Sequence, residues 1–408
     1  MIARSSTANR SPAAARAIFH QLLAAHAFAL VSTGVATVAL ALLAYDLAGV
    51  EAGAVLGTAL GIKMLGYVLV TPVASAFAER LPRRATLVFL DVVRAGVVLA
   101  LPFVTRIVEI YVLIFIFQAA SATFTTTLQA TVPELFEERR EYARALSLTR
   151  LAVELENLVS PLLAAVLLLV LSFRGLFVLT VAGFLLSAAI ILLAALPAAR
   201  DRIPTEIGTR VTGGFRKLLD TPRLRALIAL NLAASAAAAM VIVNTVVYVQ
   251  ANLGLTATAT AAALAVYGAG SVAGALLVPR LMALTSDRSA MLAGAALAAI
   301  GLVGGVSVSA YFALLPLWFA LGFGAALAQT PAGVLICRSC AEDDRQSLYA
   351  AQFAISSACL LLTYPLAGWL GAETGMEAAF LVLGAVAALS VGTAARLWPY
   401  DDRAALEA

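Results

Sequence analysis

Residues 174–197 read RGLFVLTVAGFLLSAAIILLAALP, and this stretch decides which kind of fold the chain adopts. Only its first residue, Arg174, is charged. One helical crossing of the hydrocarbon core of a bilayer takes about 20 consecutive, mainly apolar residues. The stretch is therefore long enough and apolar enough to form one transmembrane helix.

The composition of the whole chain is also strongly apolar. Its 408 residues are 62% hydrophobic and only 12% charged, and the mean hydropathy is +0.97. Soluble domains carry about 25% charged residues, so a soluble protein is excluded. A transmembrane β-barrel is excluded as well, because its strands would alternate polar and apolar residues, whereas these runs are continuously apolar. We therefore predict an all-α protein that crosses the membrane many times.

Twelve apolar runs are separated by short charged breaks, of which residues 198–222 are the longest and most charged. We predict an N-terminal six-helix bundle at 1–197, a cytoplasmic linker at 198–222, and a C-terminal six-helix bundle with a short tail at 223–408. The predicted transmembrane helices are residues 18–46, 53–78, 84–105, 108–134, 142–170, 174–197, 223–250, 256–280, 289–310, 312–337, 346–370 and 375–397.

A short internal repeat supports the division into halves. SPLLA at 160–164 in the fifth run and YPLAG at 364–368 in the eleventh run lie 204 residues apart, which is half of the chain length. Six-helix repeats of parallel orientation are the plan of secondary transporters that rock around a central site. The twelve helices are therefore expected to form two six-helix pseudo-repeats.

The basic residues predict the orientation, since Lys and Arg near helix ends are retained on the cytoplasmic side. They gather at the N-terminus, in every second break and in the tail, whereas the opposite breaks hold only Arg106 and Arg174. Both termini are therefore predicted to be cytoplasmic. The preference for Arg over Lys and the richness in Ala are typical of a GC-rich bacterial genome, so we expect the bacterial inner (cytoplasmic) membrane.

Three motifs resemble those of the major facilitator superfamily, and within it the proton-driven drug and siderophore exporters. SAFAERLPRR at 75–84 is similar to the family signature Gly-x-x-x-Asp-Arg-x-Gly-Arg-Arg, with Ser, Glu and Pro at three of its positions. The segment from Phe124 to Pro133 resembles the end of the fourth helix of these exporters. NLVSP at 157–161 resembles their Gly-Pro motif, with Ser in place of Gly. The resemblance implies the twelve-helix facilitator fold and transport by alternating access.

The resemblance also implies a latch on the cytoplasmic face, where an acid lies at a helix N-terminus of the other half and arginines hold acids and carbonyls. The alternative is that these arginines only set the topology. Pro161 and Pro365 are expected to bend the fifth and eleventh helices. The latch candidates are Glu79, Arg80, Arg83, Arg84, Asp91 and Arg94.

Ionisable groups in the middle of transmembrane helices are costly and mark pathways or coupling sites. The predicted helices place Lys63, Glu154 and Glu156 there. Arg150, Glu154 and Asn157 share one helix face, which Glu156 does not. The facilitator plan brings the second and fifth helices to one cavity, so we expect Lys63 to contact Glu154, the proton carrier, with Arg150 beside it. The alternative is a static network that fixes helix packing.

The predicted C-terminal helices hold no acid or base at mid-span, and their polar side chains are amides and phenols. Such groups suit a mainly apolar cavity for an amphipathic organic molecule. The candidates for the substrate cavity in both halves are Asn157, Gln118, Asn231, Asn244, Tyr248, Tyr267, Gln329 and Gln352.

Other chemistry is not indicated by the sequence. Its two histidines, His20 and His26, form no metal-binding cluster, and the spacing of Cys337 and Cys340 lacks a βαβ context. The phosphate-binding loop of an ATP-driven pump is missing. We expect no enzyme activity, metal, cofactor or nucleic-acid partner. The expected partners are the lipid bilayer, a small-molecule substrate and protons, and the expected state is a monomer.

The sequence thus predicts a secondary active transporter that exports a small, amphipathic organic compound by proton antiport. Two alternatives stay open. One is a facilitator or symporter that binds an anion or metabolite through Lys63. The other is a membrane sensor or scaffold that has the fold without transport.

Overall fold

The computed structural model describes residues 12–78, 82–136, 141, 145, 148–149, 152, 160, 162–194, 196, 215–339 and 345–398. This part of the chain is helical and contains no β-strand. Ten of its segments are long and apolar enough to cross a membrane, and the first, Ala14–Val70, contains two helices in succession. The predicted all-α membrane fold is confirmed.

The described part of the first half contains five long helices. A 3₁₀ turn at Gly49–Glu51 (η1) joins the first two, and one at Leu101–Phe103 (η2) follows the third. The predicted fifth helix, 142–170, and the predicted linker lie largely outside the described residues, although 162–167 are helical. The helices are α1 (Pro12–Ala48), α2 (Ala52–Ala78), α3 (Arg83–Ala100), α4 (Ile107–Leu135) and α6 (Phe173–Leu193).

The described part of the second half contains six long helices and two short helical segments, at 215–220 and Ala332–Arg338. The predicted helix 312–337 is interrupted at Pro331, which has no N–H to donate to the helix. A π-helical turn at Tyr248–Asn252 (η3) and a 3₁₀ turn at Gly305–Ser307 (η4) extend two of the helices. The helices are α8 (Pro222–Val247), α9 (Ala257–Leu284), α10 (Asp287–Gly304), α11 (Tyr311–Gln329), α12 (Ala332–Arg338), α13 (Arg345–Glu373) and α14 (Met376–Leu397).

Local signals define several helix ends. Ser172, Thr256 and Ser286 precede helices and accept a hydrogen bond from the backbone N–H three residues later. Gly49 and Gly375 have φ angles of +56° and +92°, which side chains rarely tolerate, and they turn the chain after α1 and α13. These turns join long helices into antiparallel neighbours.

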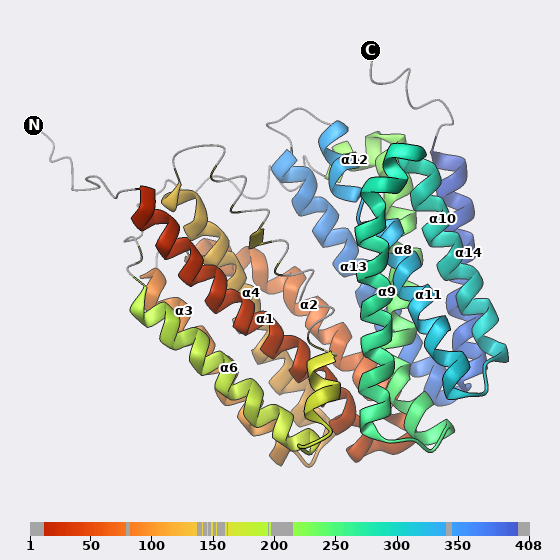
Figure 1. Ribbon diagram of the computed structural model, residues 1–408, viewed down its shortest axis with the longest axis horizontal. Helices are drawn as coiled ribbons and strands as arrows, with labels where there is room; N and C mark the ends of the chain where they lie inside the picture. The colour runs from red at the N-terminus through yellow and green to blue at the C-terminus, as the bar shows by residue number, and fades with distance from the viewer. Residues whose placement is uncertain are drawn as a thin grey trace, which may run out of the picture.

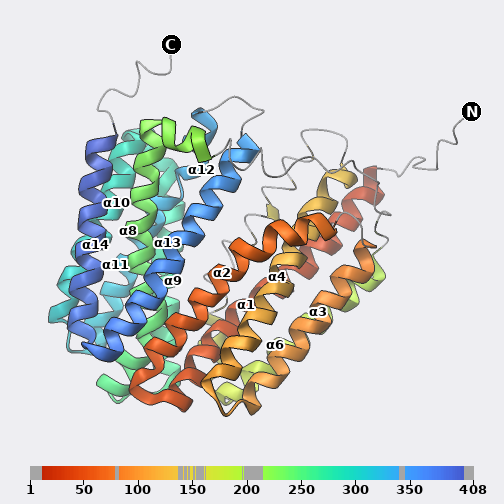
Figure 2. The same ribbon diagram turned by 180° about the vertical axis from the view of Figure 1, so that it is seen from behind.

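The helices form two bundles, one from α1 to α6 and one from α8 to α14 (Figure 1). The start of α1 and the end of α14 lie on the same side, which we call the termini side. Seen from the front and from behind, the bundles meet on the opposite side and diverge toward the termini side (Figure 2). The described parts of the two bundles therefore contact each other on the side opposite the termini.

Glycines bring the two bundles together at α2 and α13. Gly53, Gly57 and Gly61 follow one another every four residues, so they share one face of α2. A Cβ atom at Gly57 would collide with the carbonyl oxygen of Tyr364, and one at Gly368 would collide with the carbonyl of Gly53. Small residues let helix backbones approach closely inside a membrane. The close contact of α2 with α13 therefore requires glycine, which has no side chain, at these positions.

Replacing Gly57 with Leu should separate the bundles on the side opposite the termini. Overpacking costs about 1–3 kcal/mol, and each 1.4 kcal/mol is about a tenfold change in population. Spin labels at Val50 and Thr374, which are exposed on that side, would report the separation in a background without the three native cysteines. We expect their distance distribution to shift to longer values.

The matched control is Gly96→Leu in α3, where a Cβ atom has no neighbour within 4 Å. This variant should leave the distances unchanged. An unchanged distribution in Gly57→Leu would show that the glycine contact does not hold the bundles together.

Candidate functional site

A buried ion pair lies at the centre of the first bundle. Asp91 is 0% exposed and Arg94 is 3% exposed, and the Arg94 guanidinium donates a hydrogen bond to the Asp91 carboxylate. The second carboxylate oxygen accepts a hydrogen bond from Ser187 of α6 at 2.7 Å. At 1.5 Å per residue, Asp91 lies about 12 Å from the start of the apolar segment Arg83–Phe103. The pair is therefore in the middle of the span.

Aromatic rings surround the arginine of this pair. The guanidinium carbon of Arg94 lies 4.1 Å from the ring centre of Phe124 and 4.8 Å from that of Phe184. Such cation–π contacts contribute about 2 kcal/mol when desolvated, whereas breaking a buried ion pair costs about 3–5 kcal/mol. The two rings therefore supply an interaction for Arg94 that is comparable to the one with Asp91.

His26 of α1 completes this cluster. Its ring stacks on Phe124, with centroids 6.2 Å apart, and the residue is 4% exposed. His26 Nδ1 and Arg94 Nε are buried and have no hydrogen-bond partner in the described part of the chain. Buried polar atoms are normally paired, so these two mark spare hydrogen-bonding capacity.

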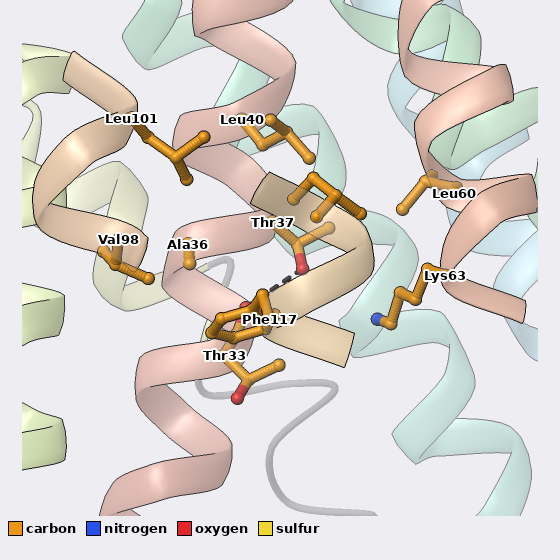
Figure 3. A pocket seen from close by; sticks show the side chains of 10 residues that line it. Thr33, Ala36, Thr37, Leu40, Leu60, Lys63, Val98, Leu101 and Phe117 are labelled. Carbon is orange, nitrogen blue, oxygen red and sulfur yellow. Dashed lines mark hydrogen bonds between the residues drawn. The ribbon is translucent and has the colours of Figure 1, made fainter. Parts of the chain in front are cut away.

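Lys63 of α2 lies in a separate small cavity between α1, α2, α3 and α4, and its amine points into it (Figure 3). The cavity has a volume of about 20 Å³, enough for a water molecule and too small for an organic substrate. Thr33 and Thr37 donate their hydroxyl protons to the carbonyls of Ala29 and Thr33, so their oxygens are left as acceptors. Acceptors complement the Lys63 ammonium or a water bound to it.

The predicted contact of Lys63 with Glu154 stays a prediction. Glu154, Arg150, Asn157 and Pro161 all lie outside the described residues. Within the described part of the chain, Lys63 forms no ion pair with an acid.

Gln118 of α4 is the least satisfied of the predicted cavity residues. It is 0% exposed, and neither its amide oxygen nor its amide nitrogen has a partner among the described residues. Its Cγ atom lies 3.0 Å from the position that a Cβ atom on Gly66 would take, so Gln118 packs closely against α2. An unpaired buried amide costs free energy, which makes Gln118 a candidate for binding a water or a substrate.

Two of the predicted cavity residues in the second bundle join helices. Asn244 Nδ2 donates to the carbonyl of Ala367 on α13 at 3.0 Å, and the Tyr248 hydroxyl donates to the carbonyl of Val308. These contacts hold α8 against its neighbours, and Asn244 does so beside Gly53 at the contact between the bundles.

The other predicted cavity residues are scattered. Asn231 is 1% exposed and its Nδ2 has no partner in the described part of the chain. Gln352 donates to Ser356 at 3.5 Å, Tyr267 is half-buried, and Gln329 is exposed at the end of α11. The structure does not gather these side chains around one cavity among the described residues, and Pro365 packs against Gly61 at the bundle contact.

The latch candidates lie within the first bundle where they are described. Arg83 is buried and donates to Thr131 of α4 at 3.1 Å, and Arg84 is exposed. Asp91 and Arg94 contact α4 and α6 rather than the second bundle. Glu79 and Arg80 lie outside the described residues.

Sequence reasoning missed the aromatic cluster and its histidine. The signal for the ion pair was present, because Asp91 and Arg94 are three residues apart and near the middle of an apolar segment. Nothing local in the sequence connects them to His26, Phe124, Phe184 or Ser187, which come from three other helices.

Two helical bundles with buried charges at mid-span define a multi-pass membrane transport protein. The family model of the Major Facilitator Superfamily matches residues 22–250 and 227–407, which together cover nearly the whole chain. The protein therefore belongs to the major facilitator superfamily of transporters. No curated protein shows significant sequence similarity to it.

Solved structures agree with this fold. A bacterial homolog of the human lysosomal transporter Spinster, in an inward-facing and unoccupied conformation, superimposes with a TM-score of 0.74 at 12% identity, covering 96% of this chain and 100% of that one. The nucleoside transporter NupG gives 0.76 at 11% identity, covering 94% and 100%. A POT family transporter in complex with 5-aminolevulinic acid gives 0.70 at 14% identity, covering 91% and 94%. Identities this low show the fold alone.

Gln118→Met should stabilise the protein and weaken transport. The substitution removes a buried, unpaired amide, which we expect to raise stability by about 1–2 kcal/mol, visible as a higher melting temperature of the purified protein. If the amide binds substrate or a water in the pathway, transport of a substrate should fall at the same time.

Asn244→Leu is the matched comparison, because Asn244 donates a hydrogen bond to α13. This variant should lower the melting temperature. A lower melting temperature in Gln118→Met would show that Gln118 has a partner outside the described residues.

Proposed function

We propose that this transporter exports a small, amphipathic organic compound across the bacterial inner membrane by proton antiport. The observation that carries the proposal is the combination of a bundle contact on one side with buried charges at mid-span. A close contact between the bundles on one side is expected in an end state of alternating access, and buried charges are the usual means of coupling transport to ions.

The predicted orientation gives this end state a direction. With both termini cytoplasmic, as the sequence predicts, the glycine contact would lie on the outer side, and we propose that this conformation faces inward. An exporter takes up its cargo in this state.

The proposed coupling residues lie in the first bundle. Lys63 is half-buried beside the threonine oxygens of α1, and Glu154 and Arg150 are proposed to complete its surroundings. The proposed cargo contacts are amide and phenol groups such as Gln118 and Asn231, which suit a mainly apolar compound with few polar groups. We propose a monomer, since the two bundles of one chain supply both sides of the pathway.

The proposal predicts uphill transport that depends on a proton gradient. Proteoliposomes containing the full-length protein should accumulate tetraphenylphosphonium, a lipophilic cation, when a pH gradient is imposed, and a protonophore should abolish the accumulation. Glu154→Gln should lose this uphill transport and retain counterflow exchange, because a neutral amide cannot carry the proton while the cargo pathway is intact.

The control for Glu154 is Glu109→Gln. Glu109 accepts hydrogen bonds from the backbone of Thr105 and Arg106 at the start of α4, and Gln can accept them too. The Glu109→Gln variant should therefore transport at the wild-type level. Uphill transport that survives in Glu154→Gln contradicts the role of Glu154.

Ligand-induced thermal stabilisation distinguishes the proposed exporter from a facilitator or symporter that binds an anion through Lys63. A ligand that binds only the folded state raises the melting temperature of the protein. Stabilisation by organic anions that disappears in Lys63→Met would favour a facilitator or symporter. Exchange of neither cations nor anions across a sealed membrane would favour the sensor or scaffold.

A further inference from the structure

Asp91 is a buried acid in a segment apolar enough to cross a membrane, and such acids commonly mark proton pathways. It is 0% exposed in the middle of a membrane span, and each oxygen has one hydrogen-bond donor, from Arg94 and from Ser187. We infer that Asp91 is a protonation site of the transport cycle, separate from Glu154. This inference rests on the proton antiport of the proposed function.

The aromatic rings make the neutral form of Asp91 tolerable. An arginine keeps its charge at all physiological pH values, so Arg94 remains a buried cation when Asp91 takes up a proton. A buried cation without partners is strongly unfavourable. Here, however, the rings of Phe124 and Phe184 stay within cation–π distance whatever the charge of Asp91.

Two hydrogen-bonding atoms at the ion pair are available for new hydrogen bonds when Asp91 becomes neutral. Arg94 Nε and His26 Nδ1 have no partner among the described residues, so the Arg94 Nε–H can donate a new hydrogen bond and His26 Nδ1 can form one, directly or through water, when Asp91 releases the guanidinium. No second acid pairs with Arg94 in this part of the chain. The titratable or charged groups that face Asp91 and Arg94 are His26 from α1 and Tyr67 from α2, while α4 and α6 present Phe124, Phe184 and Ser187.

Tyr67 connects the ion pair with the second bundle. It lies within electrostatic range of Arg94, and its ring meets Phe353 of α13 edge-on, with centroids 5.7 Å apart. The same two helices carry the glycine contact that closes the opposite side.

The proton balance of this step is simple. One proton from the outer aqueous phase binds one Asp91 oxygen and converts the carboxylate into a carboxylic acid. In the inward-facing state the acid releases the proton to the inner aqueous phase, and Arg94 and Ser187 again bind the carboxylate, as in this structure.

Infrared difference spectroscopy of the purified full-length protein tests the inference without any substrate. Between alkaline and acidic pH, a buried carboxylic acid adds a carbonyl stretching band in heavy water. We expect the wild type to show a band that Asp91→Asn lacks and Glu154→Gln keeps. The control is Asp46→Asn, at an exposed carboxylate whose closest basic partner is Arg174 at 3.6 Å, and it should also keep the band. A spectrum without any Asp91-dependent band overturns the inference.

Ser187→Ala provides a second test of the inference, which applies if the Asp91→Asn variant does not fold. The Ser187 hydroxyl donates to the ionised form, so its loss should move the midpoint of the infrared transition upward by about 1 pH unit. An unmoved midpoint overturns the assignment to Asp91.

Transport measurements separate a coupling role from a structural one. With tetraphenylphosphonium in proteoliposomes, folded Asp91→Asn should keep counterflow and lose accumulation driven by the pH gradient. Gradient-driven accumulation at the wild-type level overturns the inference while leaving the proposed function intact. A wild type that shows the Asp91 band and transports no lipophilic cation supports the protonation site and contradicts the proposed cargo.

Discussion

The bilayer offers no water to polar groups, and this constraint shapes the whole structure. Helices satisfy their own backbone, which is why the described chain contains long helices and no strands. The same constraint acts on side chains: Asp91 and Arg94 are buried only because Ser187, Phe124 and Phe184 from two other helices surround them. The ion pair is thus also a contact that fixes α3 against α4 and α6.

The contact between the bundles follows a different principle. It uses glycines and backbone oxygens at α2 and α13, together with a hydrogen bond from Trp369 to Thr58 at 3.1 Å. Close packing of small residues is favourable in a membrane and requires no charge to be buried or exposed when the helices separate. A bundle interior held by charges and rings, and a bundle interface held by glycines, allow the bundles to move as units.

The sequence predicts the helices well and the site only in part. The hydropathy of a transmembrane helix can be read directly along the chain. For this reason the ends of α4 and α14 lie within two residues of the predicted 108–134 and 375–397. The site depends on which helix faces meet. The same count along the chain assigned Asp91 and Arg94 to a surface latch, although Ser187, 96 residues later, is what holds Asp91 inside the bundle. The stacking of His26 on Phe124 leaves no periodic signal in either helix.

Arg94 and Lys63, two cations near the middle of their helices in the first bundle, are not equivalent. Arg94 is permanently charged and is balanced in the described chain by Asp91, whereas Lys63 faces threonine oxygens and no described acid. In the proposed cycle, a proton on Asp91 leaves both Arg94 and Lys63 without a carboxylate partner among the described residues, and the departure of the proton restores the partner of Arg94. Charges interact over long distances in a low-dielectric interior. A proton on Asp91 therefore disfavours a cationic cargo anywhere in the pathway beside this bundle, so the proton and the cargo compete without sharing a single contact.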